Sequence, residues 1–231
     1  MDAFIYDSDE FRHELESSPH HAGEVSFLRL IARPGMHVME IGANTGVIAT
    51  ALAKSIGDAG YLYAFEPVPE YYTKLMENLS RNDVKNVSAY RLALSNQTGR
   101  IRFYKREGGG SGITPAREGE ALWVETTTVT EFLVVQKIDG IDLLNLDCEG
   151  SELLVLQGAK AVLEKHLPQI FCEIHHGYLK ELGQSTDDVI GYLSQFGYEV
   201  RLLQVEDLNA ETTTNTCSHV YAAKPDPHAW V

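Results

Sequence analysis

Cysteine and long apolar runs are scarce in this chain of 231 residues. Its three cysteines, Cys148, Cys172 and Cys217, are far apart and include no C-x-x-C pair, so neither a disulfide framework nor a zinc ribbon is indicated. No apolar stretch is long enough to span a bilayer, and the N-terminal segment lacks the apolar core of a signal peptide. These absences predict a cytoplasmic protein that has no membrane partner.

Positive charge is also scarce, since 19 Lys and Arg stand against 33 Asp and Glu and the formal net charge is −14. No run of Lys or Arg outweighs that charge locally, so binding to a phosphate backbone is unfavourable and nucleic acid is not an expected partner. The composition, 44% hydrophobic and 23% charged, is that of a globular protein. We expect a single domain over residues 1–231.

Apolar periodicity predicts alternating strands and helices after a helical preamble over residues 1–35, which Pro34 and Gly35 end. The expected strands cover residues 37–41, 60–67, 86–95, 141–150, 168–176, 198–203 and 219–225. Amphipathic helices separate most of them, and the helix that follows residue 150 breaks near Gly158. This order implies right-handed crossovers between parallel strands, so we expect a doubly wound α/β fold with a mostly parallel sheet.

The segment from residue 96 to residue 131 departs from this alternation. GRIRFYKR alternates as an edge strand, residues 108–112 are rich in glycine, and LWVETTTVTEFL is rich in β-branched residues. We interpret the segment as an inserted β-hairpin with a flexible loop. The loop is either a plain connection or a lid over the site.

The stretch MEIGANTG places Gly42 and Gly46 between a strand and a helix. It is not the full G-x-G-x-x-G of a dinucleotide site, because Asn44 stands where the second glycine would be. In open parallel sheets, ligands bind at the carboxyl ends of the strands, where the strand order reverses. The turn, which also contains the small residue Ala43, is therefore expected to let a nucleoside approach the backbone.

Two acids specify the expected ligand further. Glu66 ends the second strand, 20 residues beyond Gly46, where a carboxylate accepts hydrogen bonds from both ribose hydroxyls. Glu40 comes just before the turn, where it would repel a pyrophosphate but would suit the positively charged amino group, and indirectly the sulfonium, of S-adenosylmethionine. The pattern favours S-adenosylmethionine, with the alternative that Glu40 merely faces solvent.

Three stretches, MEIGANTG, FEPVPEYYTKLMENLSRN and IDLLNLDCEGSELLVLQGAKAVL, resemble the signature blocks of the FkbM family of S-adenosylmethionine-dependent methyltransferases. The D-C-E-G block at residues 147–150, followed by Glu152, is the most distinctive part of the likeness. The resemblance implies the Rossmann-like fold of class I methyltransferases, with a seven-stranded sheet whose last strand is antiparallel. It also implies O-methylation of a hydroxyl on a small molecule or sugar. Many relatives carry lysine where this chain has Asn145, and if that lysine binds substrate in them, the substrate here differs.

On these grounds we assign cofactor binding to Glu40, Gly42, Ala43, Asn44, Gly46, Glu66, Pro67, Ala93 and Asp147. Methyl transfer requires an acceptor held in line with the departing sulfur, and a base helps a hydroxyl to lose its proton. The catalytic candidates are the polar residues that end the fourth and fifth strands, namely Asp147, Glu149, Glu173, His175 and His176. A histidine titrates near neutral pH, so His175 or His176 is the preferred base, and a structural hydrogen bond is the alternative for each. His20 and His21 could close over the site from the preamble.

Asp147, Glu173 and a histidine also have the composition of a divalent-metal site, in which Mg²⁺ would hold the acceptor oxygens. No compact ligand motif fixes that geometry, so no residue is assigned as a metal ligand. Two other functions stay open, a non-catalytic S-adenosylmethionine-binding or scaffold protein and a nicotinamide-dependent oxidoreductase. The acid–histidine cluster argues against the first, and Asn44 argues against the second.

Overall fold

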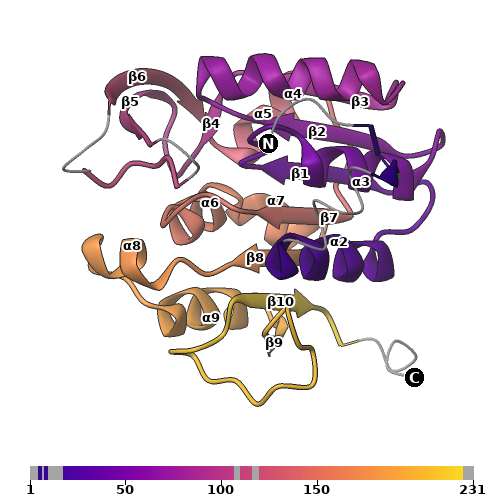
Figure 1. Cartoon of the computed structure of the whole chain (residues 1–231). Helices are drawn as coiled ribbons and strands as arrows, with labels where there is room; N and C mark the ends of the chain where they lie inside the picture. The colour runs from indigo at the N-terminus through magenta and orange to yellow at the C-terminus, as the bar shows by residue number, and fades with distance from the viewer. Residues whose placement is uncertain (1–4, 7, 10–17, 107–109, 116–119, 226–231) are drawn as a thin grey trace.

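A computed structural model describes residues 5–6, 8–9, 18–106, 110–115 and 120–225. Parts of the expected preamble and of the glycine-rich loop lie outside these ranges. The central feature is a seven-stranded sheet in the order β3-β2-β1-β7-β8-β10-β9 (Figure 1). Its strands are β1 His37–Ile41, β2 Tyr61–Phe65, β3 Val87–Tyr90, β7 Leu143–Leu146, β8 Gln169–Glu173, β9 Glu199–Leu203 and β10 His219–Ala223.

The strand directions confirm the expected fold class. β3, β2, β1, β7 and β8 pair in parallel, whereas β10 runs antiparallel to both of its neighbours, β8 and β9. The chain builds the sheet outward from β1 in one direction and from β7 in the other, so the strand order reverses between these two strands. The carboxyl ends of β1 and β7 therefore mark the place where such sheets bind ligands.

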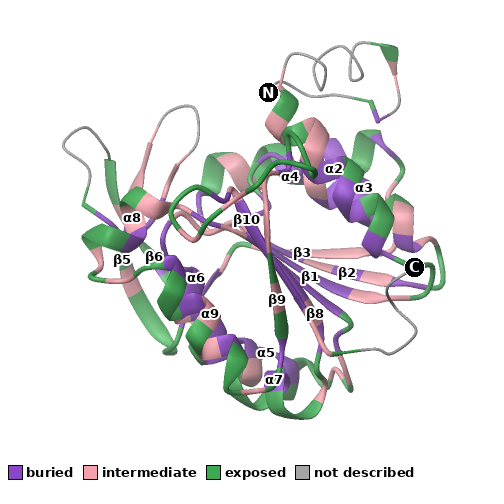
Figure 2. Cartoon of the chain, turned by 90° about the horizontal axis from the view of Figure 1, so that it is seen from below, coloured by how far each residue is buried: buried purple, intermediate pink, exposed green. Residues whose placement is uncertain are grey.

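Helices cover both faces of the sheet, as Figure 2 shows. One face carries α2 Pro19–Ile31, α3 Val47–Ile56 and α4 Pro69–Arg81. The other carries α5 Val129–Gln136, α6 Glu152–Gly158, α7 Lys160–Lys165 and α9 Thr186–Ser194, while the short α8 His176–Glu181 follows β8. Each interface has its own apolar cluster, around Leu52 and Leu75 on the first face and around Phe132 and Leu156 on the second. Because both faces are buried, the central strands are almost wholly apolar.

The segment between β3 and α5 contains the expected hairpin. β5 Gly99–Lys105 pairs antiparallel with β6 Glu120–Thr127, and the short β4 Ala93–Leu94 joins them in a second sheet of three strands. The strand expected over residues 86–95 is thus divided between two sheets. The β-branched stretch after β6 also turns into α5, because the Thr128 hydroxyl accepts a hydrogen bond from the Glu131 N–H and caps the helix.

No helix in the described part of the chain is long and apolar enough to cross a membrane.

The helix that was expected to break near Gly158 does so, with α6 ending at that residue and α7 beginning at Lys160. A Cβ added at Gly158 would lie 2.0 Å from the carbonyl oxygen of Ser95, which is backbone and has little freedom to move. The end of α6 therefore packs directly on the chain that links β4 to the hairpin.

We expect Gly158→Ala to lower the free energy of unfolding by about 2–3 kcal/mol, because the added methyl group forces two backbone segments apart. Gly191→Ala in α9 is the matched control, since a Cβ there meets nothing within 4 Å and alanine favours a helix by up to about 1 kcal/mol. Urea denaturation of both variants measures the difference. Equal stability of the two variants would contradict the packing described here.

Candidate active site

The site begins where the ends of β1 and β7 come together. The Asp147 N–H donates a hydrogen bond to the carbonyl oxygen of Ile41 at 2.9 Å. Gly42 has a φ of 95°, and a Cβ there would lie 1.7 Å from the carbonyl oxygen of Asp147. Gly46, at the start of α3, has a φ of 92° and packs on Leu75. Both glycines are thus required by the protein's own packing.

Glu66 lies beside this turn and is held by its backbone. The Asn44 N–H donates to Glu66 Oε2 at 2.9 Å, and the Val68 N–H donates to Oε1 at 2.8 Å. Burial of the side chain raises the pKa of Glu66 to about 7, although these two hydrogen bonds favour the carboxylate. Each oxygen keeps a second lone pair, so the ionised carboxylate is able to accept two further hydrogen bonds.

Two cavities meet at the carboxyl ends of the strands. The first, called here the apolar cavity, has Phe65, Leu92 and Phe103 in its wall. Of the residues assigned to cofactor binding, it is lined by Gly42, Asn44, Glu66, Pro67, Ala93 and Asp147. Its wall is thus largely apolar and carries a carboxylate that has spare acceptor capacity.

The second cavity, called here the acidic cavity, has a volume of about 370 Å³. Its ionisable lining residues are Glu24, Glu40, Asp147, Glu149, Glu173, Lys74, His20, His21 and His175, and Ala43 also lies in its wall. Gly42, Asn44, Asp147 and Glu149 line both cavities, so the two spaces are adjacent.

Glu40 is buried in β1 and faces Asn145, its register partner in β7. The Asn145 side-chain amide donates to Glu40 Oε2 at 2.6 Å. Burial raises the pKa of Glu40 to about 8 because a neutral amide compensates only part of the lost hydration. Asn145 therefore supports a carboxylate that lines the acidic cavity, and Glu40 does not face bulk solvent.

His175 lies at the centre of four carboxylates. Its Nε2 is 3.0 Å from Glu149 Oε2, 3.6 Å from Asp147 Oδ1 and 3.7 Å from Glu173 Oε1. Its Nδ1 is 2.8 Å from Glu152 Oε1. The structure thus brings together the candidates Asp147, Glu149, Glu173 and His175, which all line the acidic cavity.

These carboxylates decide the charge of His175. Burial alone would lower the pKa of His175, but the hydrogen bond to Glu152 and the negative charges of Glu173 and Glu149 raise it to about 9. The imidazole is therefore protonated at neutral pH in the free protein. This charge state counts against its expected role as the first proton acceptor.

Asp147 and Glu173 have opposite pKa shifts. Burial and the charge of Glu173 raise the pKa of Asp147 well above its ordinary value. Burial opposes ionisation of Glu173 too, but the hydrogen bond from His20 and the charge of His175 hold its pKa below the ordinary value. Since two adjacent carboxylates resist simultaneous ionisation, the pair keeps its proton on Asp147.

The turn after β7 accounts for the convergence on His175. β7 ends at Leu146, and Glu149 adopts a left-handed conformation with a φ of 51°, which is uncommon for a residue with a side chain. The strand expected over residues 141–150 thus ends before Glu149, and the turn sets the direction of this carboxylate. Glu152, to which the sequence analysis gave no role, is fully buried and also accepts a hydrogen bond from the Gly150 N–H at 2.9 Å.

His176 does not join the cluster. Its Nε2 lies 2.8 Å from the carbonyl oxygen of Cys217, and its Nδ1 lies 3.2 Å from the Thr186 hydroxyl. Both ring nitrogens therefore have structural partners, because the chain has left β8 and begins α8 at this residue. Of the residues assigned to the cofactor, Gly46 alone lines neither cavity among the described residues.

The hairpin segment lies beside both cavities. Gly110 lines each of them, and a Cβ there would be 3.1 Å from the Tyr178 hydroxyl. The Arg106 guanidinium donates to the Gly110 carbonyl oxygen and lies over the Tyr178 ring, 4.6 Å from its centroid. The described part of the glycine-rich loop is thus held against the site, while residues 108–109 lie outside the described ranges.

Comparison with known proteins gives methyltransferases as relatives. 2-O-methyltransferase NoeI of Sinorhizobium fredii is 26% identical over 154 residues, which cover 59% of this chain and 62% of that protein. Hexuronic acid methyltransferase AglP of Haloferax volcanii is 25% identical over 158 residues, which cover 67% of this chain and 64% of that protein. The matched region thus spans just under two thirds of each relative.

Solved structures share the fold. A methyltransferase FkbM from Methylobacillus flagellatus superposes with a TM-score of 0.58 at 16% identity, covering 86% of this chain and 50% of that one. Fibrillarin from Aeropyrum pernix, solved with natively bound S-adenosylmethionine, has a TM-score of 0.53 at 15% identity and covers 89% of this chain and 76% of that one. The family model described as "Methyltransferase FkbM domain" matches residues 40–200, from the acid in β1 into β9. The chain therefore belongs to the FkbM methyltransferase domain family.

Proposed function

We propose that this protein transfers a methyl group from S-adenosylmethionine to a hydroxyl of a sugar or another small molecule. The observation that carries the proposal is the meeting of the apolar and acidic cavities at Asp147. A nucleoside in the first cavity and an acceptor in the second would both lie beside that carboxylate. Membership in the family supports the same activity.

The residues present fit S-adenosylmethionine. The apolar wall with Phe103 suits the adenine, and Glu66 has the acceptor capacity for both ribose hydroxyls. Glu40 offers a carboxylate for the ammonium group. Asp147 Oδ1 is buried and has no hydrogen-bond partner among the described residues, which suits a cationic ligand. When bound, S-adenosylmethionine supplies an electrophilic methyl group on its sulfonium sulfur.

Asp147 is the group best placed to receive the acceptor. Its side chain is 35% exposed, against 19% for Glu149, 18% for Glu173 and 15% for His175. In the free protein Asp147 holds a proton, and the positive charge of S-adenosylmethionine beside it would favour the ionised form. We infer that the ionised carboxylate accepts a hydrogen bond from the substrate hydroxyl, orients it, and takes its proton as the methyl group passes from sulfur to the hydroxyl oxygen. His175 then acts as a fixed positive charge that holds the surrounding carboxylates in place.

The charge of the acidic cavity restricts the acceptor. Two relatives are a 2-O-methyltransferase and a hexuronic acid methyltransferase, which supports a sugar as the acceptor. In this chain, however, two carboxylates share each protonated imidazole, Glu173 and Glu206 at His20 and Glu149 and Glu152 at His175. Their surplus negative charge would repel an acceptor that carries a carboxylate or a phosphate. We therefore propose a neutral sugar or alcohol, and neither a hexuronic acid nor a nucleic acid.

Two finer points complete the proposal. Dependence on Mg²⁺ stays a prediction, for which the neighbouring carboxylate oxygens of Asp147 and Glu149 are the candidate ligands. Cys148, Cys172 and Cys217 are free thiols, which a reducing compartment preserves, so we place the reaction in the cytoplasm.

Calorimetric titration with S-adenosylmethionine, S-adenosylhomocysteine and NAD⁺ tests the cofactor first. We expect binding of the first two and none of NAD⁺. A panel of neutral sugars and alcohols, supplied with S-adenosylmethionine and with or without Mg²⁺, is then assayed for S-adenosylhomocysteine. Cofactor binding without turnover of any acceptor would favour the non-catalytic alternative, and binding of NAD⁺ alone would favour an oxidoreductase.

For an acceptor found in that way, we expect Asp147→Asn to lower kcat by about 10²-fold or more, because the amide orients a hydroxyl but takes no proton. Asp142→Asn is the matched control, since Asp142 precedes the same strand and its carboxylate accepts the His37 N–H at the far end of the sheet. Steady-state kinetics and S-adenosylhomocysteine titration measure both variants. Full turnover by Asp147→Asn would contradict the assigned role as base, and loss of S-adenosylhomocysteine binding would show that Asp147 serves the cofactor instead.

We expect S-adenosylhomocysteine to bind about tenfold more weakly at pH 6 than at pH 8. With a pKa of about 7 in the free protein, Glu66 is mostly protonated at pH 6 and must release that proton to accept the ribose hydroxyls, so affinity rises with pH through 7. Calorimetry at pH 6 and pH 8 measures the change. Glu66→Gln should bind more weakly at pH 8 and show a smaller pH dependence, the remainder coming from Glu40, whereas Glu70→Gln, a change at an exposed carboxylate on α4, should keep the full dependence.

A further inference from the structure

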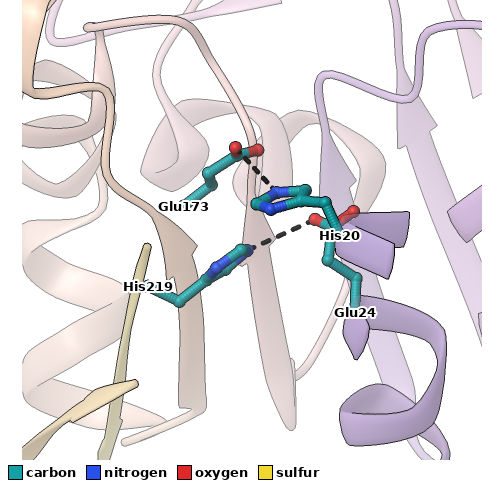
Figure 3. Close-up of side chains that lie close together, drawn as sticks. All are labelled: His20, Glu24, Glu173 and His219. Carbon is teal, nitrogen blue, oxygen red and sulfur yellow. Dashed lines mark hydrogen bonds and ion pairs between the residues drawn. The ribbon is translucent and has the colours of Figure 1, made fainter. Parts of the chain in front are cut away.

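A second cluster of ionisable side chains lies on the wall of the acidic cavity. It consists of His20, Glu24, Glu173 and His219, shown in Figure 3 and called here the His₂Glu₂ cluster. Each residue offers one nitrogen or oxygen, and these four atoms all lie within 4.8 Å of one another. His20, Glu24 and Glu173 line the cavity, and His219 lies behind them.

The cluster consists of two facing pairs of residues, one on α2 and one on the strands β8 and β10. His20 and Glu24 are four residues apart on α2, so their side chains share one face of the helix. Glu173 and His219 are directly opposite each other in the antiparallel ladder of β8 and β10, where side chains also project to the same face. The two pairs meet where α2 crosses the sheet (Figure 3).

The side chains of the cluster are largely buried although they are ionisable. Glu24 is 5% exposed and His219 is 1% exposed, and Glu173 is 18% exposed at its side chain. His20 Nε2 lies 3.0 Å from Glu173 Oε1, and His219 Nε2 lies 3.3 Å from Glu24 Oε1. Burying two carboxylates is costly unless positive charge lies close to them.

Each histidine also has a partner outside the cluster. His20 Nδ1 lies 2.7 Å from Glu206 Oε1, and His219 Nδ1 lies 3.0 Å from the Ser218 hydroxyl. The His219 ring is further fixed by stacking on Phe171 at a centroid distance of 4.5 Å. In both cases the outer contact leaves Nε2 directed into the cluster. Metal-ligating histidines are oriented in the same way by a second hydrogen bond from the other ring nitrogen.

We propose that the His₂Glu₂ cluster binds one divalent transition-metal ion. Two imidazoles with two carboxylates suit Zn²⁺, Mn²⁺ or Fe²⁺, whereas Mg²⁺ prefers a set of oxygens alone. The ion would neutralise the buried carboxylates and join α2 to the sheet beside the acceptor. Glu173 is also a candidate in the composition predicted for Mg²⁺, but Asp147 takes no part in this cluster, and the inference does not depend on methyl transfer.

The test measures metal binding by the full chain without any methyl donor. Purified protein is freed of metal with a chelator and dialysed, then titrated with Zn²⁺, Mn²⁺ and Mg²⁺ by calorimetry, and with Co²⁺ by visible absorption. We expect one Zn²⁺ or Co²⁺ per chain and no binding of Mg²⁺ at this cluster. Glu24→Gln and His219→Gln should each weaken Zn²⁺ binding at least 100-fold, because the first removes a carboxylate ligand at unchanged side-chain shape and the second removes an imidazole ligand.

His21→Gln is the matched control, since His21 is the next residue on α2 but is not a member of the cluster. It should bind Zn²⁺ as the unchanged chain does. Circular dichroism of each metal-free variant shows that the fold is retained. Absence of Zn²⁺ and Co²⁺ binding, equal binding by Glu24→Gln, or binding that requires His175 and not Glu24 would each overturn the proposal.

Discussion

The close approach of β1 and β7 at their carboxyl ends is the constraint on which the rest of the site depends. Gly42 has no side chain, and this lets the backbone of Asp147 come so near that any other residue would collide with its carbonyl oxygen. The approach places the turn after β1, which positions Glu66 through the Asn44 N–H, next to the turn after β7, which carries Asp147 and Glu149. One backbone contact thus sets the distance between Glu66, proposed to hold the nucleoside, and Asp147, proposed to receive the acceptor.

Nearby imidazoles explain how several buried carboxylates are tolerated side by side in the acidic cavity. Each buried carboxylate would be unfavourable alone, and the imidazoles of His20 and His175 compensate several of them at once. Glu40 has only the neutral amide of Asn145, so it is the carboxylate with the most to gain from a cationic ligand. A cationic ligand beside Glu40 would therefore add an electrostatic stabilisation that the free protein lacks.

Much of the fold was predictable because its signals are local. Parallel strands buried on both faces are continuous apolar runs, and Gly42, Gly158 and Pro34 mark real boundaries. The start of α5 was missed although its capping pair, Thr128 and Glu131, is visible in the sequence, because the preceding β-branched residues suggested a continuous strand.

The site was only partly predictable. The ends of the expected strands identified Asp147, Glu173 and His175 as candidates. No local sequence signal distinguishes His175 from His176. The two side chains have different neighbours because α8 begins at His176. The pairing of Glu24 with His219 joins residues 195 positions apart and has no signal in the sequence.

The family match runs from residue 40 to residue 200, whereas α2 and β10 lie outside it. Both elements nevertheless supply part of the surroundings of the acidic cavity, α2 through His20 and Glu24 and β10 through His219 behind them. Under the proposed function, the matched segment supplies both the residues assigned to the nucleoside and Asp147, while the flanks close one side of the acceptor cavity. Changes confined to these flanks would therefore alter the acceptor cavity and leave the residues assigned to the cofactor untouched.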